Sequence, residues 1–363
     1  MRRDKQGKLR RAVIGGIVLA VAAGGWYSVG LYRNKKAVES MIAERRRQEA
    51  QAQAERAEKT EEAREGRLFA GPEEGTVTYQ GKTYCRNTAV KPILCIGVDR
   101  SGSMTETTLS GDGGQADGIF LLAQDTARNQ IKILLIPRDT ITPIMKTDIS
   151  WSDKNGTELG MDLDHLSLSY AYGDGRQKSC EYTVQAVSEL LEGFPIPYYM
   201  AADTSVISAL NDAVGGVTVT VPTLGMDQAD PAFVFGEKVT LQGAQAERFV
   251  RYRDTTVDNS AIHRMDQQKA YISGFFEAVQ QTSKSNGNII SDLFDLTQDY
   301  MVTNMPKDQY LKVALDALQG SGFSDDSFCF APGSGTATET YDEYYVDQDA
   351  LDQVILQLFY SEQ

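Results

Sequence analysis

Apolar and polar residues alternate along the chain with two different periods. Short runs of period two, and unbroken apolar runs bounded by turn residues, predict strands; runs with a period near 3.6 predict helices. The predicted strands span residues 76–79 and 82–84 (a hairpin), 92–98, 118–123, 130–136, 217–221 and 339–345. The predicted helices span residues 179–191, 205–214, 244–251, 264–281, 290–300 and 349–359. Strands interleaved with helices predict a three-layer α/β domain.

Residues 12–32 form an uncharged, largely apolar stretch. About 20 such residues cross a bilayer as a helix. Residues 1–11 carry six Lys or Arg residues, and this basic tail is expected to stay in the cytoplasm. The alternative is a cleaved signal peptide, but no small-residue cleavage site ends the apolar run. The pattern therefore favours an uncleaved transmembrane helix.

Residues 33–70 are rich in Ala, Glu, Arg and Gln and contain no Pro. Strong helix formers with few large apolar residues predict a solvated helical stalk. A disordered charged spacer is the alternative. The composition changes near Gly71 and Pro72, so we expect a short β accessory segment at 71–87 and the main domain at 88–363.

The charge is distributed unevenly. Residues 1–36 carry nine basic residues and one acid, a charge of +8; the total is −14, which leaves −22 on the rest of the chain. Nucleic-acid binding requires a basic surface, so nucleic acid is excluded as a partner of the main domain. A local arginine cluster on an acidic protein fits a small anionic ligand better.

The cysteine and histidine content excludes a zinc site. There are two histidines, His165 and His263, and no C-x-x-C pair. The four cysteines allow three full disulfide pairings, among which the sequence does not choose. They are Cys85, Cys95, Cys180 and Cys329.

Two arginines one residue apart, Arg251 and Arg253, are the strongest chemical signal. On extended backbone they would point the same way and hold phosphate oxygens bidentately. Acidic partners lie upstream at Asp99, at Asp117, and beside Arg138. Arginines and carboxylates in one cleft predict a metal-assisted pyrophosphate site.

Seven short motifs in this order resemble the LytR-CpsA-Psr family of cell-wall phosphotransferases. They are IGVD (96–99), QAD (115–117), IPRDT (136–140), SYAYG (169–173), GGVTV (215–219), VRYR (250–253) and RMDQQ (264–268). The resemblance implies an αβα sandwich with a central mixed β-sheet and a hydrophobic tunnel for an isoprenoid lipid. It implies transfer of a glycopolymer, such as teichoic acid or capsule, from undecaprenyl pyrophosphate to peptidoglycan. The protein is then a single-pass cell-membrane protein with an extracellular C-terminal domain.

The same resemblance assigns roles to individual residues. A magnesium ion, with Mn²⁺ as the alternative, would lie between Asp99 and Asp117. Asp99 or Asp139 would help to deprotonate the acceptor hydroxyl. The implied pyrophosphate-binding residues are Arg138, Arg251, Arg253, Arg264 and Gln268, and the implied catalytic residues are Asp99, Arg138, Asp139, Arg251 and Arg253.

Two alternative functions are consistent with parts of the sequence. Gln115, His165 and Gln267 occupy positions where the family usually has a basic residue, which favours a tethered binding protein for polyprenyl pyrophosphate or glycan without transfer activity. Asp99 to Ser103 also reads D-x-S-x-S, a signature of von Willebrand A adhesion modules. That fold requires a long helix directly after the motif, whereas a glycine-rich loop follows here. The sequence does not reveal which glycopolymer is handled or the oligomeric state.

Overall fold

The computed structural model describes residues 67–69, 75–107, 109–147, 158–254, 260–320, 322–337 and 341–363. The predicted basic tail and membrane helix lie outside these residues, as does the predicted stalk except for residues 67–69. Within the described ranges, no helix combines the length and the apolar character needed to cross a bilayer.

A six-stranded mixed sheet forms the centre of the domain, in the order β11-β8-β3-β4-β5-β12. β3 pairs in parallel with β8, β5 pairs in parallel with β12, and the other pairs are antiparallel. β3 is buried along almost its whole length because it lies between two other strands. The strands are β3 (Val90–Val98), β4 (Ala116–Asp125), β5 (Gln130–Ile136), β8 (Tyr198–Asp203), β11 (Met301–Thr303) and β12 (Phe328–Phe330).

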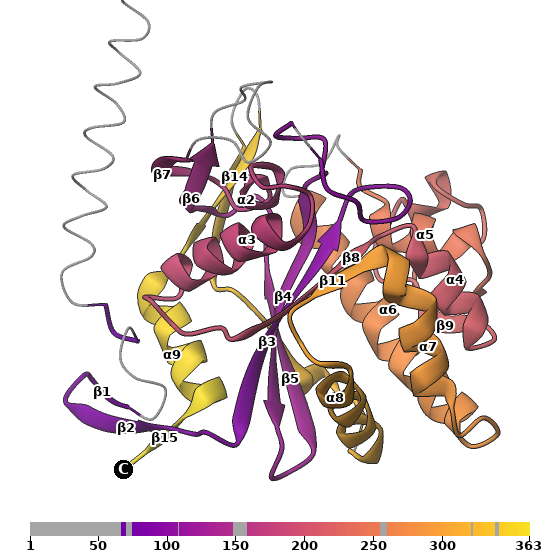
Figure 1. The fold of residues 1–363 in the computed structure, drawn as a ribbon. Coiled ribbons are helices and arrows are strands. Elements are labelled where there is room, and N and C mark those ends of the chain that lie inside the picture. Colours follow the sequence, from indigo (N-terminus) through magenta and orange to yellow (C-terminus); the bar gives the residue numbers. More distant parts are fainter. Residues whose placement is uncertain are drawn as a thin grey trace, which may run out of the picture. The chain divides into compact units, whose positions relative to one another are not determined.

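Helices cover both faces of this sheet (Figure 1). Alternate residues of a strand point to opposite faces. Leu94 and Ile96 of β3 share a core with the first helix group, whereas Ile93 and Cys95 pack towards α8 on the other face. The first group is α2 (Leu168–Ala171), α3 (Gln177–Leu190) and α9 (Gln348–Phe359). The second is α4 (Val206–Ala213), α5 (Ala244–Arg251), α6 (Ser260–Ser283), α7 (Ile289–Thr297) and α8 (Lys307–Gln319).

Four smaller sheets surround this core. The predicted accessory hairpin is confirmed as β1 and β2, and the C-terminal strand β15 adds to it. The described part of the predicted strand 339–345 belongs to β14, which pairs with β13 in a separate ribbon rather than with the central sheet, whose edge strands are β11 and β12. The strands are β1 (Thr76–Tyr79), β2 (Lys82–Arg86), β6 (Ile141–Thr147), β7 (Glu158–His165), β9 (Val217–Thr220), β10 (Lys238–Leu241), β13 (Gly333–Ala337), β14 (Asp342–Val346) and β15 (Tyr360–Glu362). The 3₁₀ helices are η1 (Met226–Gln228), η2 (Gln298–Tyr300) and η3 (Asp325–Ser327).

The predicted site residues lie together at one end of the strands of the central sheet. β3, β5 and β8 finish at this end and the antiparallel β4 begins there. Asp99 therefore follows β3, Asp117 is the second residue of β4, and Arg138 follows β5. A Cβ atom added at Gly118 would lie 3.5 Å from Nε2 of Gln268. This distance is an ordinary van der Waals contact, so α6 lies directly against the sheet beside Asp117.

Candidate active site

Asp117 lies between two arginines. Its Oδ1 is paired with Arg138, and Nη1 of Arg264 lies 3.1 Å from its Oδ2. Nη2 of Arg264 also donates to the backbone oxygen of Asp117 at 3.1 Å, and Arg138 donates to Gln115 at 3.1 Å. Burial lowers the pKa of Arg264, and the charge of Asp117 opposes this shift. The family usually has an arginine at position 115. Here Gln115 instead accepts a hydrogen bond from Arg138 and holds that arginine in place.

Asp139 joins this arrangement to Arg253. Its Oδ1 accepts from Nε of Arg138 at 3.2 Å, and its Oδ2 lies 3.6 Å from Nη2 of Arg253. Oδ2 is buried and has no hydrogen-bond partner. Arg253 donates instead to Ser260 at 2.7 Å and to Asp342 at 2.9 Å. An ion pair without a hydrogen bond leaves Oδ2 of Asp139 able to accept a proton or a donor.

The prediction that Arg251 and Arg253 form a fork on extended backbone is wrong. Arg251 is the last residue of α5, and the next residue, Tyr252, has left the helical conformation, with φ −55° and ψ 132°. Arg251 pairs with Asp99 and, at 2.9 Å, with Glu247 one helical turn earlier. Burial would lower the pKa of Arg251, but the bond to Glu247 and the charge of Asp99 outweigh this and raise it. The helix end therefore sends the two arginines to different partners.

An apolar cavity of about 380 Å³ opens beside these charges. It lies between β3, β4, β8 and β11 of the sheet and helices α4, α5, α6, α7 and α8. Asp117, Arg251, Arg264 and Gln268 belong to its wall, together with apolar side chains. The apolar wall includes Phe120, Met200, Ile207, Leu210, Tyr271 and Phe275. The cavity thus combines an apolar interior with one charged end, an arrangement suited to an amphiphile with an anionic head.

Asp203 and Thr204, which the sequence analysis missed, also line this cavity. Oδ1 of Asp203 accepts from the backbone N–H of Ser205 at 2.7 Å, while its Oδ2 and the hydroxyl of Thr204 are buried without a hydrogen-bond partner. Burial raises the pKa of Asp203. Only the pairing of β8 with β3, which places Asp203 opposite Val98, brings it beside Asp99.

The carboxylates suit a metal shared with a phosphate rather than one held by protein alone. Within the described residues, no group of three or more His, Cys, Asp or Glu side chains could hold an ion. Asp99 and Asp117 flank Arg251 at neighbouring strand ends and supply hard oxygen ligands. Mg²⁺ is commonly bound by one or two carboxylates plus substrate phosphates. The donor set therefore fits magnesium when pyrophosphate is present.

The D-x-S-x-S segment does not have the surroundings of an adhesion site. Ser101 and Ser103 are exposed, and the described residues between Asp99 and β4 form no helix. The helix that the von Willebrand A arrangement requires is thus absent from this part of the structure.

Gln267 and His165, like Gln115, have structural partners. The side-chain amide nitrogen of Gln267, in the orientation that pairs it with acceptors, donates to two backbone oxygens. These are the oxygens of Phe249 at 3.0 Å and of Tyr252 at 2.9 Å. His165 has Nδ1 3.2 Å from Asp164 and Nε2 3.0 Å from the backbone oxygen of Asp342. Gln267 and His165 therefore hold the backbones next to Arg253 and its partner Asp342.

Replacing His165 by glutamine is expected to destabilise the protein more at pH 5.5 than at pH 9. The bond to Asp164 raises the pKa of His165 against the opposing effect of burial. A raised pKa means that the stabilisation is complete below the ordinary value of about 6.5 and is lost as pH rises through the folded-state value. Thermal unfolding midpoints of both proteins at the two pH values measure this, and equal differences would contradict it.

Replacing Ala202 by phenylalanine is expected to obstruct the apolar cavity while leaving its charged end intact. Ala202 belongs to the cavity wall on β8. Forcing extra carbon atoms into an occupied space costs about 1–3 kcal/mol. The Kd for a long prenyl pyrophosphate should rise about tenfold, whereas the Kd for inorganic pyrophosphate should stay unchanged. Titration calorimetry with the two ligands separates the effects, and an equal loss for both would contradict the assignment of the cavity to the prenyl chain.

Comparison with known proteins agrees with the motifs. Residues 41–359 match the LytR_cpsA_psr family. TagU of Bacillus subtilis (strain 168), a polyisoprenyl-teichoic acid–peptidoglycan teichoic acid transferase, is 24% identical over 266 residues, which cover 73% of this chain and 76% of TagU. The TagU of Bacillus cereus (strain AH820) is 26% identical over 261 residues, covering 72% and 75%.

Solved structures share the fold. TagT bound to LI-WTA has a TM-score of 0.55 at 18% identity over 74% of this chain and 89% of that chain. TagV of Bacillus subtilis has a TM-score of 0.55 at 20% identity, over 74% and 95%. The family match, the central mixed sheet and the arginine and carboxylate network lead to one conclusion: the chain belongs to the LytR-CpsA-Psr family.

Proposed function

We propose that the protein is a membrane-anchored phosphotransferase that moves a glycopolymer from a polyprenyl pyrophosphate carrier to peptidoglycan. The observation that carries this proposal is the apolar cavity of about 380 Å³ with Asp117, Arg251 and Arg264 in its wall. A prenyl chain fits the apolar part and a pyrophosphate fits the arginines. Relatives of this chain are named as teichoic acid transferases. Residues 12–32 supply the anchor, with the catalytic domain outside the cell.

The reaction is a displacement at the phosphorus atom that carries the glycan. The acceptor hydroxyl oxygen forms the new bond to phosphorus, and the bond from phosphorus to the bridging oxygen breaks. Polyprenyl phosphate leaves with the bond electrons. The hydroxyl proton passes to Oδ2 of Asp139, which has no hydrogen-bond partner and lies beside Arg253. The glycan thereby becomes linked to its acceptor through a phosphodiester.

The arginines stabilise the charge that develops during this displacement. In the structure they are paired with carboxylates: Arg138 and Arg264 with Asp117, and Arg251 with Asp99. Incoming phosphate oxygens take over these donors. Preorganised donors of this kind are each worth about 10²–10³-fold in rate. The arginines are therefore already gathered where the pyrophosphate binds.

We propose that Asp99 and Asp117 hold Mg²⁺, or Mn²⁺ in its place, once the pyrophosphate has released their arginine partners. The bound ion would neutralise charge on the leaving phosphate. Magnesium should accordingly bind more tightly in the presence of pyrophosphate than in its absence.

The second candidate is a tethered binding protein without transfer activity. It is favoured by the neutral Gln115 and Gln267 at positions that are usually basic. Their contacts argue against it, because Gln115 holds Arg138 and Gln267 holds the backbone of Tyr252. The site thus keeps its arginines in place despite the lost charges.

A transfer assay distinguishes the two candidates. The full-length protein in detergent is incubated with a polyprenyl pyrophosphate-linked glycan and a peptidoglycan fragment, with Mg²⁺ or with EDTA. Mass spectrometry should detect the glycan phosphate on the acceptor together with released polyprenyl phosphate, in the magnesium sample only. Donor binding without either product would support the binding protein instead.

A further inference from the structure

A second pocket, of about 490 Å³, lies next to the arginines and has no part in donor binding as derived above. The segment from Pro222 to Gly225, with Phe235, forms one part of its wall. Arg253 and the first turns of α6 form another. The pocket therefore shares the active-site network through Arg253.

Helix α6 separates the two cavities. Arg264, Gln268 and Tyr271, three to four residues apart, line the apolar cavity. His263 and Asp266, on another face of the same turns, line the second pocket. A helix turns about 100° per residue, so these two sets lie on different faces.

The segment before α6 divides in the same way. Arg251 lines the apolar cavity, whereas Tyr252 and Arg253 line the second pocket. A phosphate held by both arginines would therefore lie between the two cavities. Phosphoryl transfer places the attacking and leaving oxygens roughly in line on opposite sides of the phosphorus. With the prenyl phosphate leaving towards the apolar cavity, the attacking hydroxyl must come from the other side.

We propose that the second pocket binds the acceptor, a neutral, hydroxyl-rich amino-sugar strand of peptidoglycan. This inference rests on the proposed transferase function. Phe235 and Leu224 are 53% and 72% exposed and offer apolar surface on which a sugar ring can pack. Asp266 lies in the same wall and can accept hydrogen bonds from sugar hydroxyls.

The charge of the pocket distinguishes acceptor from donor. The carboxylate of Asp266 repels a phosphate-bearing polymer, which carries the charge of the donor glycan, but accepts hydroxyl and amide donors. Arg253 of this wall lies 3.6 Å from the active-site carboxylate of Asp139 and donates to Asp342 at 2.9 Å. The pocket thus admits a neutral sugar up to the phosphate and disfavours a second anionic chain.

The test compares two pocket variants, Phe235→Ala and Asp266→Asn, with two matched surface controls. The controls are Leu315→Ala and Asp308→Asn on α8, which line neither cavity. The full-length proteins in detergent are assayed for KM towards a neutral tetrasaccharide of N-acetylglucosamine and N-acetylmuramic acid whose lactyl carboxyl groups are capped as amides. The Kd for polyprenyl pyrophosphate is measured in parallel. Each pocket variant should raise KM about tenfold and leave the donor Kd within about twofold, whereas the controls change neither.

Three outcomes would separate the claims. Unchanged KM in both pocket variants, with transfer intact in the wild type, would overturn the acceptor assignment alone. A raised donor Kd with unchanged KM would place the donor glycan in this pocket instead, which also overturns it. A wild-type protein that binds donor but transfers nothing would refute the proposed function. Saturation-transfer NMR would then decide the acceptor site, since loss of tetrasaccharide signal in Phe235→Ala but not Leu315→Ala supports it without turnover.

Discussion

Replacing Arg251 and Arg253 together by alanine is expected to raise the Kd for polyprenyl pyrophosphate at least a hundredfold. Hydrogen bonds to charged groups contribute about 1.5–3 kcal/mol each, so losing one at each arginine corresponds to about 10²–10⁴ in affinity. The two side chains retain 36% and 24% of their exposure. Because neither is fully buried, the domain should stay folded.

The matched control for this double variant is Arg128→Ala with Arg248→Ala. Arg248 lies one turn before Arg251 on α5 and is paired with Asp230, and Arg128 is paired with Asp125. Neither belongs to the apolar cavity. Fluorescence titration with a labelled prenyl pyrophosphate and a thermal unfolding curve measure both effects. An unchanged Kd in a folded double variant would remove the arginines from the binding site.

Replacing Asp117 by alanine is expected to abolish the magnesium dependence of turnover and to lower kcat about a thousandfold. The variant loses a carboxylate of the proposed metal site and leaves Arg138 and Arg264 without their shared partner. Breaking a buried ion pair costs about 3–5 kcal/mol, and the side chain of Arg264 is 6% exposed. Removing one preorganised group that stabilises charge in a transition state lowers kcat by about 10²–10³-fold. Some donor binding should survive because Arg251 and Arg253 remain.

Anion rescue distinguishes this role from simple unfolding. Inorganic pyrophosphate should raise the unfolding temperature of Asp117→Ala more than that of the wild type, because the anion replaces the missing carboxylate between the two arginines. The surface variant Asp295→Ala, which loses an exposed pair with Lys307 and a hydrogen bond from Gln298, should show neither the loss nor the rescue. Turnover in Asp117→Ala that still responds fully to magnesium would place the metal elsewhere.

Local patterns predicted the elements with strong periodicity. The strand at 130–136 and the helix at 244–251 match β5 and α5, because each has a clear apolar period and a turn at its end. Weak patterns failed: β8, with two alanines in six residues, and the three-residue β12 were missed. Both are defined by their pairing with β3 and β5 rather than by their own composition.

The sequence predicted that the candidate residues lie together, but it did not predict their contacts. Asp99, Asp117, Arg138, Asp139, Arg251, Arg253, Arg264 and Gln268 do gather at one edge of the sheet. The orientation of Arg251 followed from the end of α5, which the helix prediction already implied. The partner of Arg253, however, is Asp342, 89 residues away, and only tertiary structure brings them together.

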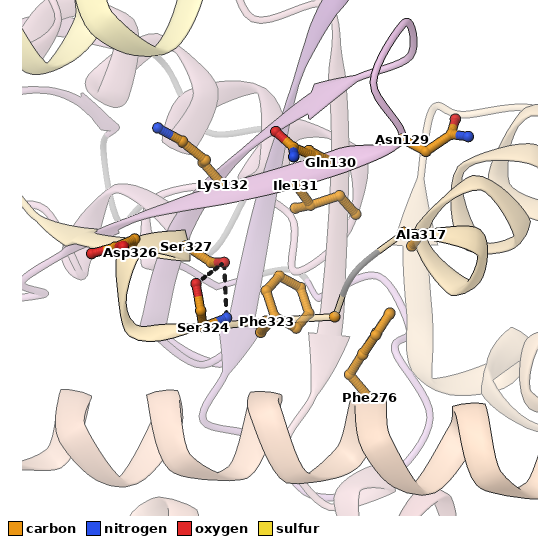
Figure 2. A pocket seen from close by; sticks show the side chains of 12 residues that line it. Asn129, Gln130, Ile131, Lys132, Phe276, Ala317, Phe323, Ser324, Asp326 and Ser327 are labelled. Atoms are coloured by element: carbon orange, nitrogen blue, oxygen red, sulfur yellow. Dashed lines mark hydrogen bonds between the residues drawn. The ribbon is translucent and has the colours of Figure 1, made fainter.

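A third pocket provides an internal comparison for the lipid assignment. It lies at the start of β5, the end of that strand remote from Arg138, and Figure 2 shows the residues that line it. Its volume is about 170 Å³, and Lys132 is the one basic side chain among the described residues of its wall. Ser324 and Ser327 hydrogen-bond to each other there (Figure 2). It lacks the arginine cluster that a pyrophosphate requires.

Photo-crosslinking tests most directly which cavity holds the donor. A prenyl pyrophosphate with a diazirine in its chain is bound to the full-length protein, irradiated, and the labelled peptides are identified by mass spectrometry. We expect labels on residues of the apolar cavity wall, such as Met200, Ile207 and Phe275, and their loss in the presence of excess unlabelled ligand. Labels concentrated on residues 222–225 or 322–327, in the other two pockets, would contradict the account.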